Sequence, residues 1–311
     1  MGPTAAGKTD AALALAARLP VEIVSVDSAM VYRGLDIGTA KPARELRLRV
    51  PHHLIDLCDP SERYSAGAFL RDASRVMAEI RGRGRLPLLV GGTMLYFRAL
   101  ELGLAALPSA DAAIRARLAA RAAATGWSRL HAELAIVDAA AAARIRPTDG
   151  QRIQRALEVH ELTGRPLSEL QREPRQGAIG GEYLKLVLAP PERTALDALL
   201  ERRFDAMLAA GFVAEVEALH RRGDLEPALP ALRSVGYRQL WMHVGGSCDL
   251  ASARTAAIQA TRQLAKRQYT WLRAERAAGW VEAQRAGVED ELCRRVDQWA
   301  NSGAGPVTSL C

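Results

Sequence analysis

The chain has 311 residues, 49% of them hydrophobic, and a formal net charge of +7. Its length allows two domains, and no apolar run reaches membrane-spanning length, so we expect a soluble cytoplasmic protein with no membrane partner. The four cysteines lie far apart and form no C-x-x-C pair, which argues against a zinc finger or a disulfide framework. The basic balance predicts either a polyanionic partner or arginine-rich solvated helices.

The first residues fit the pattern G-x-x-x-x-G-K-T of a phosphate-binding P-loop. Its glycines allow backbone N–H groups to turn toward a phosphate, Lys8 supplies a point charge, and the Thr9 hydroxyl is suited to Mg²⁺. The motif predicts a bound phosphate or diphosphate without specifying ATP, and a chance match is the alternative. The loop comprises Gly2, Pro3, Thr4, Ala5, Ala6, Gly7, Lys8 and Thr9.

A P-loop ordinarily follows a buried strand, so we expect a first strand before Met1 that the chain lacks, from a late start or a fragment. An amphipathic helix is expected over residues 10–19. The β-branched run at 21–26 predicts a strand that ends at Asp27, and the apolar run at 86–90 predicts another, followed by Gly91-Gly92-Thr93. With a helix over 66–82, this alternation is typical of an α/β fold with a parallel sheet flanked by helices.

The pattern changes between residues 104 and 183, where helices replace strands. We expect helices over 111–124, over 150–162 with a cap at Thr148 or Asp149, and after Pro166. This segment predicts an all-helical insertion between core parts 1–103 and 184–311. A strand at 182–188 resumes the sheet, and the tail after Asn301 is expected to be disordered. Further helices are expected at 193–209, 213–221, 234–243, 250–276 and 288–299.

Several motifs together resemble the tRNA dimethylallyltransferases (tRNA isopentenyltransferases) of bacterial type, without the zinc-finger extension of eukaryotic members. The resemblance covers residues 1 to about 276 in the family's order, and the run from Asp27 to Pro42 is its most specific part. The other matching segments, besides the P-loop, are PHHLID at 51–56, GGTMLY at 91–96, QRIQRALEV at 151–159, SVGYRQ at 234–239 and QLAKRQ at 263–268.

The resemblance implies a P-loop NTPase-like core and transfer of a dimethylallyl group from dimethylallyl diphosphate to the N6 amine of the adenosine 3′ to the tRNA anticodon. It implies Mg²⁺ as cofactor, the anticodon stem-loop as partner, and Asp27 as the base that accepts the amine proton. Arg203 is the expected clamp on the leaving diphosphate, and Thr93 is expected near the target nucleotide. We expect a monomer.

The expected tRNA-binding residues come from motif matches and from a stripe on the helix near the C-terminus. The stripe is Arg262, Lys266, Tyr269 and Arg273, spaced to share one helical face, where basic and aromatic groups suit RNA. The residues expected to bind tRNA are Asp27, Ser28, Ala29, Met30, Thr93, Arg115, Gln151, Arg152, Ile153, Gln154, Arg155, Arg233, Gly236, Tyr237, Arg262, Lys266 and Arg273.

Each of these residues also has an ordinary structural interpretation. Asp27 is also suited to hydrogen-bonding the ligands of a bound Mg²⁺ or to capping a helix, and Thr93 is suited to capping a helix. Arg203 and the Arg and Gln positions are suited to solvated helix faces. The adjacent histidines His52 and His53 lack the spaced partners of a metal site, so no metal is expected there. The alternative functions are a P-loop small-molecule kinase and a nucleotide-regulated RNA-binding protein, and neither explains the run from Asp27 to Pro42.

Overall fold

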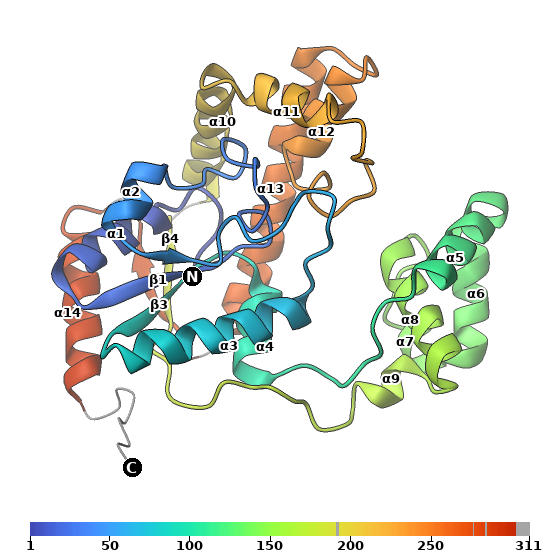
Figure 1. The fold of residues 1–311 in the computed structure, drawn as a ribbon, viewed down its shortest axis with the longest axis horizontal. Coiled ribbons are helices and arrows are strands. Elements are labelled where there is room, and N and C mark those ends of the chain that lie inside the picture. The colour runs from blue at the N-terminus through green and yellow to red at the C-terminus, as the bar shows by residue number, and fades with distance from the viewer. Residues whose placement is uncertain (191–192, 276, 284, 303–311) are drawn as a thin grey trace. The chain divides into compact units, whose positions relative to one another are not determined.

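The computed structural model describes residues 1–190, 193–275, 277–283 and 285–302 (Figure 1). From residue 303 onward, the tail that was expected to be disordered lies outside the described residues. The helices are α1 Lys8–Arg18, α2 Arg44–Arg49, α3 Ala66–Gly82, α4 Met94–Leu102, α5 Ala112–Thr125, α6 Trp127–Val137, α7 Ala139–Ala142, α8 Gly150–Thr163, α9 Leu167–Leu170, α10 Arg193–Ala209, α11 Phe212–His220, α12 Tyr237–Val244, α13 Leu250–Ala274 and α14 Val288–Asn301. The strands are β1 Val21–Val26, β2 His52–His53, β3 Leu86–Gly91, β4 Leu186–Ala189 and β5 Gly279–Glu282.

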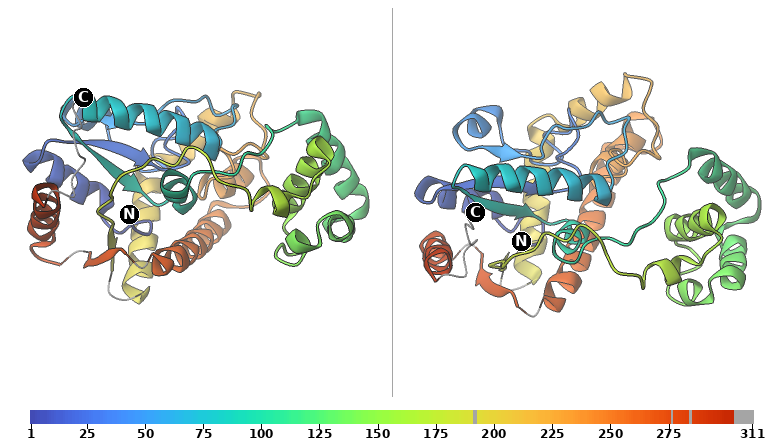
Figure 2. Two further views of the ribbon diagram at one scale, coloured as in Figure 1. Left: turned by 90° about the horizontal axis from the view of Figure 1, so that it is seen from below. Right: turned by 60° about the horizontal axis from the view of Figure 1, so that its bottom comes forward.

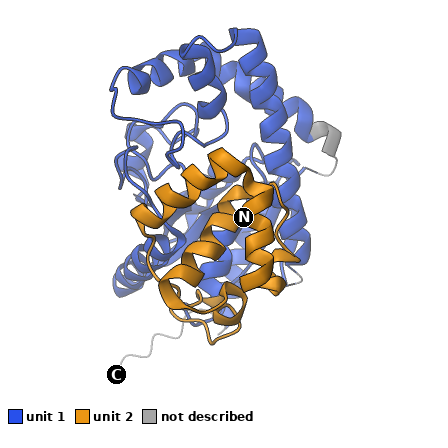
Figure 3. Ribbon diagram, turned by 90° about the vertical axis from the view of Figure 1, so that its right-hand side faces the viewer, with its two compact units in different colours: residues 1–101, 179–311 blue, residues 102–178 orange. Residues whose placement is uncertain are grey.

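The chain forms two compact units, which Figure 3 colours separately. Unit 1 comprises Met1–Glu101 and Ile179–Cys311, and unit 2 comprises Leu102–Ala178. The sequence placed the corresponding boundaries at 104 and 183. The five strands found among the described residues all belong to unit 1, and the regular elements of unit 2 are helices, apart from an isolated antiparallel pairing of Leu104 with Gln176.

Unit 1 is built on two parallel sheets, one with the order β2-β1-β3 and the other formed by β4 and β5. Figure 2 shows α3 along one face of the three-stranded sheet, with α1 and α14 on the other face. β1 pairs with β3 over its full length, from Val21 opposite Leu86 to Val26 opposite Gly91. All six residues of β1 are buried, as expected of a strand covered on both faces.

Local signals in the sequence explain where several helices begin and end. The Asp111 carboxylate accepts a hydrogen bond from the Ile114 amide at 2.9 Å, and Asp149 caps α8 by accepting from the Arg152 amide at 3.2 Å. These bonds satisfy amide groups that the first turn of a helix leaves without partners. Gly164 ends α8 in the left-handed region at φ 68°, where a glycine carries no steric cost.

The sequence missed short or weakly patterned elements. α2, β2, α4, α6, α7 and β5 were not expected, because two to eleven residues give little periodicity and β2 and β5 depend on distant strands for their ladders. The strand expected over 182–188 begins only at Leu186, which pairs with Gly279. A strand needs a hydrogen-bonded neighbour on at least one side, and the neighbour β5 begins only at Gly279, so the residues before Leu186 have no partner strand there.

A buried lysine organises the loop between β1 and β2, which carries the most specific part of the motif. The Lys41 ammonium donates to the Tyr32 carbonyl at 2.8 Å and to the carboxylates of Asp36 at 2.5 Å and Asp56 at 2.6 Å. Its side chain is only 1% exposed, and Arg47 donates to the other oxygen of Asp56 at 2.6 Å. The charged residues of the motif therefore hold the loop in one conformation.

None of the helices in the described part of the chain combines the length and the apolar character needed to cross a membrane.

Replacing Lys41 by methionine keeps most of its volume and removes the ammonium that joins these three partners. We expect the free energy of unfolding, measured in urea, to fall by about 2–3 kcal/mol, because removing one member of a buried ion pair leaves the other members without a partner. Arg75→Ala, which breaks the exposed pair of Arg75 with Glu79, is the control and should change stability little. Equal stability of Lys41→Met and wild type would contradict this role of Lys41.

Candidate active site at the P-loop

The P-loop turns its backbone toward the start of α1. Ala5 and Gly7 have positive φ angles of 63° and 75°, and Gly7 is the residue before α1. A left-handed residue next to right-handed ones makes successive N–H groups converge, which forms an anion-binding concavity. Gly7 has no side chain to cap the helix, so the first amides of α1 are left for an external acceptor.

The P-loop lies in a cleft of about 1030 Å³ within unit 1, which we call the P-loop cleft. The ends of β1 and β3 and parts of α10, α12 and α13 also line it. Its charged lining consists of two carboxylates, Asp10 and Asp27, and five cationic side chains. The cationic residues are Lys8, Arg202, Arg203, Arg233 and Arg267. The excess of positive charge favours an anionic ligand.

Gln268 of α13 connects the two sides of this cleft. Its side-chain oxygen accepts from the Thr4 amide at 3.0 Å, and its side-chain nitrogen donates to the Gly92 carbonyl at 2.9 Å. A Cβ on Gly92 would lie 2.4 Å from that nitrogen, so only glycine leaves room for the contact. Gln268 therefore fixes the P-loop against the turn that follows β3.

Asp27 and Thr93 stand at the carboxyl ends of two paired strands. Asp27 Oδ1 accepts from the amides of Ala29 at 2.8 Å and Met30 at 3.2 Å, whereas Oδ2 accepts no hydrogen bond from the described residues. Thr93 Oγ1 accepts from the Ser28 amide at 3.1 Å, and the Thr93 amide donates to the Val26 carbonyl. These bonds aim both side chains at the cleft with little freedom.

Two cations of the cleft are held partly out of water. The pKa of Lys8 is lowered to about 8, chiefly by burial and then by the Arg203 charge, while Asp27 opposes both effects. Burial also lowers the pKa of Arg203, again against the attraction of Asp27. Lys8 donates to the Pro3 carbonyl at 2.6 Å, and Arg203 has no ion pair within the described residues. The site is therefore prepared for an anion that is not part of the protein.

Most of the unit 1 residues singled out from the sequence line this cleft. They include the P-loop from Thr4 to Thr9, Asp27 to Met30, Thr93, Arg203, Arg233 and Tyr237. Tyr237 is nevertheless fully buried, and its hydroxyl donates to Glu215 at 2.5 Å. Glu215 also accepts from the amides of Asp36, Ile37 and Gly38, so Tyr237 supports the motif loop from behind. Gly236 is the N-cap that precedes α12, and it does not line the cleft.

The face of α13 that lines the cleft differs from the stripe expected from the sequence. Arg262 forms an ion pair with Glu201, Tyr269 packs into two apolar clusters, and the Arg273 guanidinium lies 5.9 Å from the Tyr269 ring centre. Lys266 is exposed. The lining residues are instead Thr261, Leu264, Arg267, Gln268 and Trp271. A period of three to four residues in this second set is visible in the sequence, but no charge pattern marks it.

In unit 2, most of the motif residues of α8 hold the unit together. Glu158 is fully buried and accepts from Arg115 at 2.7 and 3.0 Å and from Arg155 at 2.7 Å. Burial raises the pKa of Glu158, but these hydrogen bonds outweigh it and the net shift is downward. Gln154 donates to the Arg115 carbonyl at 2.9 Å, and Ile153 is fully buried in the core. Arg152 is the exception, with a side chain 71% exposed.

Comparison with known proteins gives the family. The family model described as IPP transferase matches residues 30–275. The chain belongs to the IPP transferase family. It is 57% identical to the tRNA dimethylallyltransferase of Halorhodospira halophila, over 99% of this chain and 97% of that protein. This similarity to a family member confirms the resemblance that the motifs indicated.

Solved structures of family members share the fold. The tRNA isopentenylpyrophosphate transferase of Bacillus halodurans is 36% identical, with a TM-score of 0.68 over 95% of this chain and 93% of that one. A eukaryotic dimethylallyltransferase acting on tRNA has a TM-score of 0.72 at 25% identity, over 96% of this chain and 74% of that one. The α/β class with a parallel sheet flanked by helices is confirmed, and the alternatives of a kinase or an RNA-binding regulator are not favoured.

The low pKa of Lys8 predicts how binding of an anion depends on pH. The protonated lysine binds a diphosphate better, so affinity should be full below pH 8 and fall above it, by up to about tenfold per pH unit. Calorimetry with an alkyl diphosphate, whose last ionisation is near pH 6, would measure this between pH 7 and 9.5. Lys8→Met is the control and should bind weakly with no such dependence. Unchanged wild-type affinity across this range would refute the prediction.

Proposed function

We propose that the protein transfers a dimethylallyl group from dimethylallyl diphosphate to the N6 amine of the adenosine 3′ to the anticodon of tRNA. The proposal rests on one observation, the convergence of the P-loop, two desolvated cations and Asp27 in the same cleft. The name of the relative from H. halophila, tRNA dimethylallyltransferase, supports the choice of substrates. We place this activity in the cytoplasm, in a monomer whose partners are the donor and the tRNA anticodon stem-loop.

The donor diphosphate would bind the P-loop from Gly2 to Thr9. Amides of the loop and of the first turn of α1 would donate to its oxygens, and Lys8 and Arg203 would neutralise its charge. As the bond from carbon to oxygen breaks, negative charge grows on the departing diphosphate, and these same groups stabilise it. Arg203 is suited to this because its guanidinium has no competing ion pair in the described structure.

The donor set of the cleft fits Mg²⁺. The Thr9 hydroxyl and the Asp27 carboxylate both line it, and Mg²⁺ prefers hard oxygen ligands shared between a few protein groups and phosphates. Thr9 would hold the ion against the diphosphate, and the ion would supply positive charge for the leaving group. A His or Cys cluster is not required for such binding.

Asp27 would act on the acceptor. The adenine amine is a weak nucleophile because its lone pair is delocalised into the ring, and a carboxylate that takes its proton assists the attack. The N6 nitrogen forms a bond to the first carbon of the dimethylallyl group, diphosphate leaves with the electron pair, and one amine proton passes to Asp27. The hydrogen bonds of Oδ1 to Ala29 and Met30 hold the carboxylate in place while Oδ2 receives the proton. The adenosine must be flipped out of the loop to reach this depth.

For tRNA in unit 1, we assign contacts to the cleft-lining residues Ser28 to Met30, Thr93 and Arg233, and add Arg267 and Trp271 of α13. Trp271 is 37% exposed and has the Arg98 guanidinium 5.6 Å from its ring, so it offers a flat surface for a base. Of the residues in the stripe expected from the sequence, we assign Lys266 a contact with the phosphate backbone of the tRNA. Arg262 and Arg273 are engaged within the protein and contribute less.

We also propose that unit 2 is the insertion that binds tRNA. The exposed guanidinium of Arg152, beside Gln151 at the start of α8, is its best candidate for a phosphate contact. Arg115, Gln154 and Arg155 would act indirectly, by holding α8 in place through Glu158. Ile153 would contribute only to the core.

The reaction is tested by incubating the protein with dimethylallyl diphosphate, Mg²⁺ and tRNA, followed by digestion and mass spectrometry of the nucleosides. A prenylated adenosine from the position 3′ to the anticodon is the expected product. Release of diphosphate without a modified nucleoside, or ATP turnover in place of transfer, would overturn the proposal.

Asp27→Asn should lower kcat by about 10²–10⁴-fold while the affinity for tRNA stays close to wild type. Asparagine keeps the oxygen that accepts from Ala29 and Met30, so the loop is preserved and only basicity is lost. Single-turnover rates and filter binding measure the two effects separately. A kcat within a few-fold of wild type would exclude Asp27 as the base.

Arg267→Glu should raise KM for tRNA at least about tenfold. It should also reduce the salt dependence of tRNA binding, because a variant that makes one phosphate contact fewer releases fewer counterions when it binds. KM for the donor should change much less. Arg221→Glu, at the residue that follows α11, is the matched control, since Arg221 is 71% exposed and does not line the cleft. Equal losses in both variants would mean that tRNA responds only to overall charge.

A further inference from the structure

Two exposed apolar side chains line the P-loop cleft, and we call them the apolar rim. Leu95 of α4 is 51% exposed, and Trp271 of α13 is 37% exposed. The other large apolar side chains that are exposed among the described residues do not line the cleft: Leu48, Leu57, Leu102, Ile136, Leu162, Met242, Leu250 and Trp280. Scattered single leucines need no explanation, whereas two apolar groups in one strongly charged cleft fit a ligand that is itself both charged and apolar.

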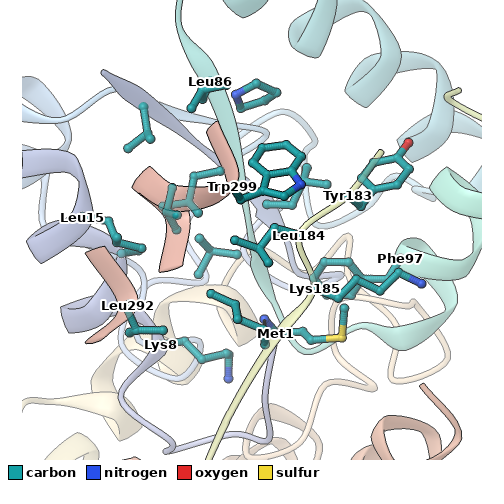
Figure 4. A pocket seen from close by; sticks show the side chains of 18 of the residues that line it. Met1, Lys8, Leu15, Leu86, Phe97, Tyr183, Leu184, Lys185, Leu292 and Trp299 are labelled. Atoms are coloured by element: carbon teal, nitrogen blue, oxygen red, sulfur yellow. Dashed lines mark hydrogen bonds between the residues drawn. The ribbon is translucent and has the colours of Figure 1, made fainter. Parts of the chain in front are cut away.

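The core of unit 1 fixes the position of Leu95. Its neighbours Met94 and Tyr96 are buried, and the Tyr96 ring stacks on Phe69 with 4.1 Å between the ring centres. Phe97, two residues further and therefore on the opposite face of the helix, lines a separate apolar cavity of about 190 Å³ (Figure 4). The helix is thus anchored on its other faces, and the exposure of Leu95 does not come from a loose helix end.

A cation connects the two members of the apolar rim. The Arg98 guanidinium lies 5.6 Å from the centre of the Trp271 ring, and Arg98 follows Leu95 by three residues in α4. Residues three apart are neighbours on one face of a helix, so Leu95 and Trp271 flank the same guanidinium. Arg267, one turn before Trp271, also lines the cleft. Apolar and aromatic groups that alternate with cations are the surface that holds unstacked nucleobases and their phosphates.

The start of α4 is also tied to the strand end that carries Asp27. The Thr93 amide donates to the Val26 carbonyl at 3.2 Å, and Thr93 Oγ1 accepts from the Ser28 amide at 3.1 Å. Leu95 is only two residues from Thr93, for which we proposed a contact with the tRNA. Its side chain is therefore held close to the position proposed for the target adenosine.

A base that leaves a stacked loop uncovers the faces of the bases on either side of it, and this opposes flipping. Proteins that unstack nucleic acids often insert an apolar side chain, leucine among others, into the opened step. Leucine at position 95 has the chemistry and the rigid support that this role requires.

We propose that Leu95 enters the gap left by the flipped adenosine, and that Leu95 and Trp271 cover the bases that flanked it. The occupant of the apolar rim is therefore the pair of nucleobases next to the target in the anticodon loop. This inference rests on the proposed function, which supplies the flipped adenosine. It makes Leu95 a positioning residue, which favours the reactive conformation of the RNA and takes no part in proton transfer.

The first test measures flipping without reaction. An anticodon stem-loop carries 2-aminopurine at the target position, because this base fluoresces when it is unstacked and has no N6 amine to be prenylated. Saturating wild-type protein should raise the fluorescence at least about threefold, and Leu95→Ala should lose at least about half of that rise. Leu95→Met, which keeps an apolar side chain of similar volume, should retain it. Leu48→Ala on α2 is the matched control, since Leu48 is 78% exposed and does not line the cleft.

The second test removes the bases that the apolar rim is proposed to cover. Single-turnover transfer to an ordinary stem-loop should be about five- to tenfold slower in Leu95→Ala than in wild type. With abasic nucleotides on both sides of the target adenosine, the same substitution should change the rate less than about twofold, because no stack remains to be opened.

Equal fluorescence in Leu95→Ala and wild type would overturn the inference. Equal losses of rate with the ordinary and the abasic stem-loop would also overturn it, and would show that Leu95 contacts RNA without regard to the flanking bases. The proposed function fails separately: wild-type protein that flips 2-aminopurine but does not prenylate adenosine would refute the transfer and leave the role of Leu95 in flipping intact.

Discussion

The side chain of Gln268 is the contact on which the geometry of the cleft depends. It is buried, and its two polar atoms bond to Thr4 of the P-loop and to Gly92 after β3. Three segments that are far apart in the sequence thereby meet at one amide group. The positions of Lys8 on the loop and of Thr93 beside Gly92 follow from that junction. A buried amide with both its oxygen and its nitrogen engaged resists displacement, because each lost bond leaves a desolvated polar group.

Around that junction, the protein leaves positive charge without an equal amount of negative charge. Lys8 and Arg203 are both desolvated, and the carboxylate of Asp27 attracts both of them. This arrangement costs stability in the absence of ligand, and an anion between the cations would recover that cost. Elsewhere in the chain, the opposite rule applies, since the buried carboxylate of Glu158 and the buried ammonium of Lys41 are fully surrounded by partners. Incomplete charge compensation therefore distinguishes the cleft from structural ion networks.

The sequence predicted the parts of the structure whose signals are local. The boundaries of β1 and α3 follow from an apolar run and from a capped, periodic segment, and both agree with the structure. The P-loop and Asp27 were identified because the end of a strand and a pattern of glycines can be recognised from neighbouring residues in the sequence. Glu215 was missed, although it clamps three amides of the motif loop, because its partners lie about 180 residues away. Arg267 and Trp271 were missed for a related reason: which face of α13 meets the cleft is decided by packing against α10, not by the spacing of its charges.

Unit 2 has its own apolar core, and its two ends are tied together by a reciprocal pair of hydrogen bonds between Leu104 and Gln176, at 3.0 and 2.9 Å. The polypeptide therefore enters and leaves this unit at one point. A segment with adjacent ends can be gained, lost or replaced during evolution without separating the chain on either side of it.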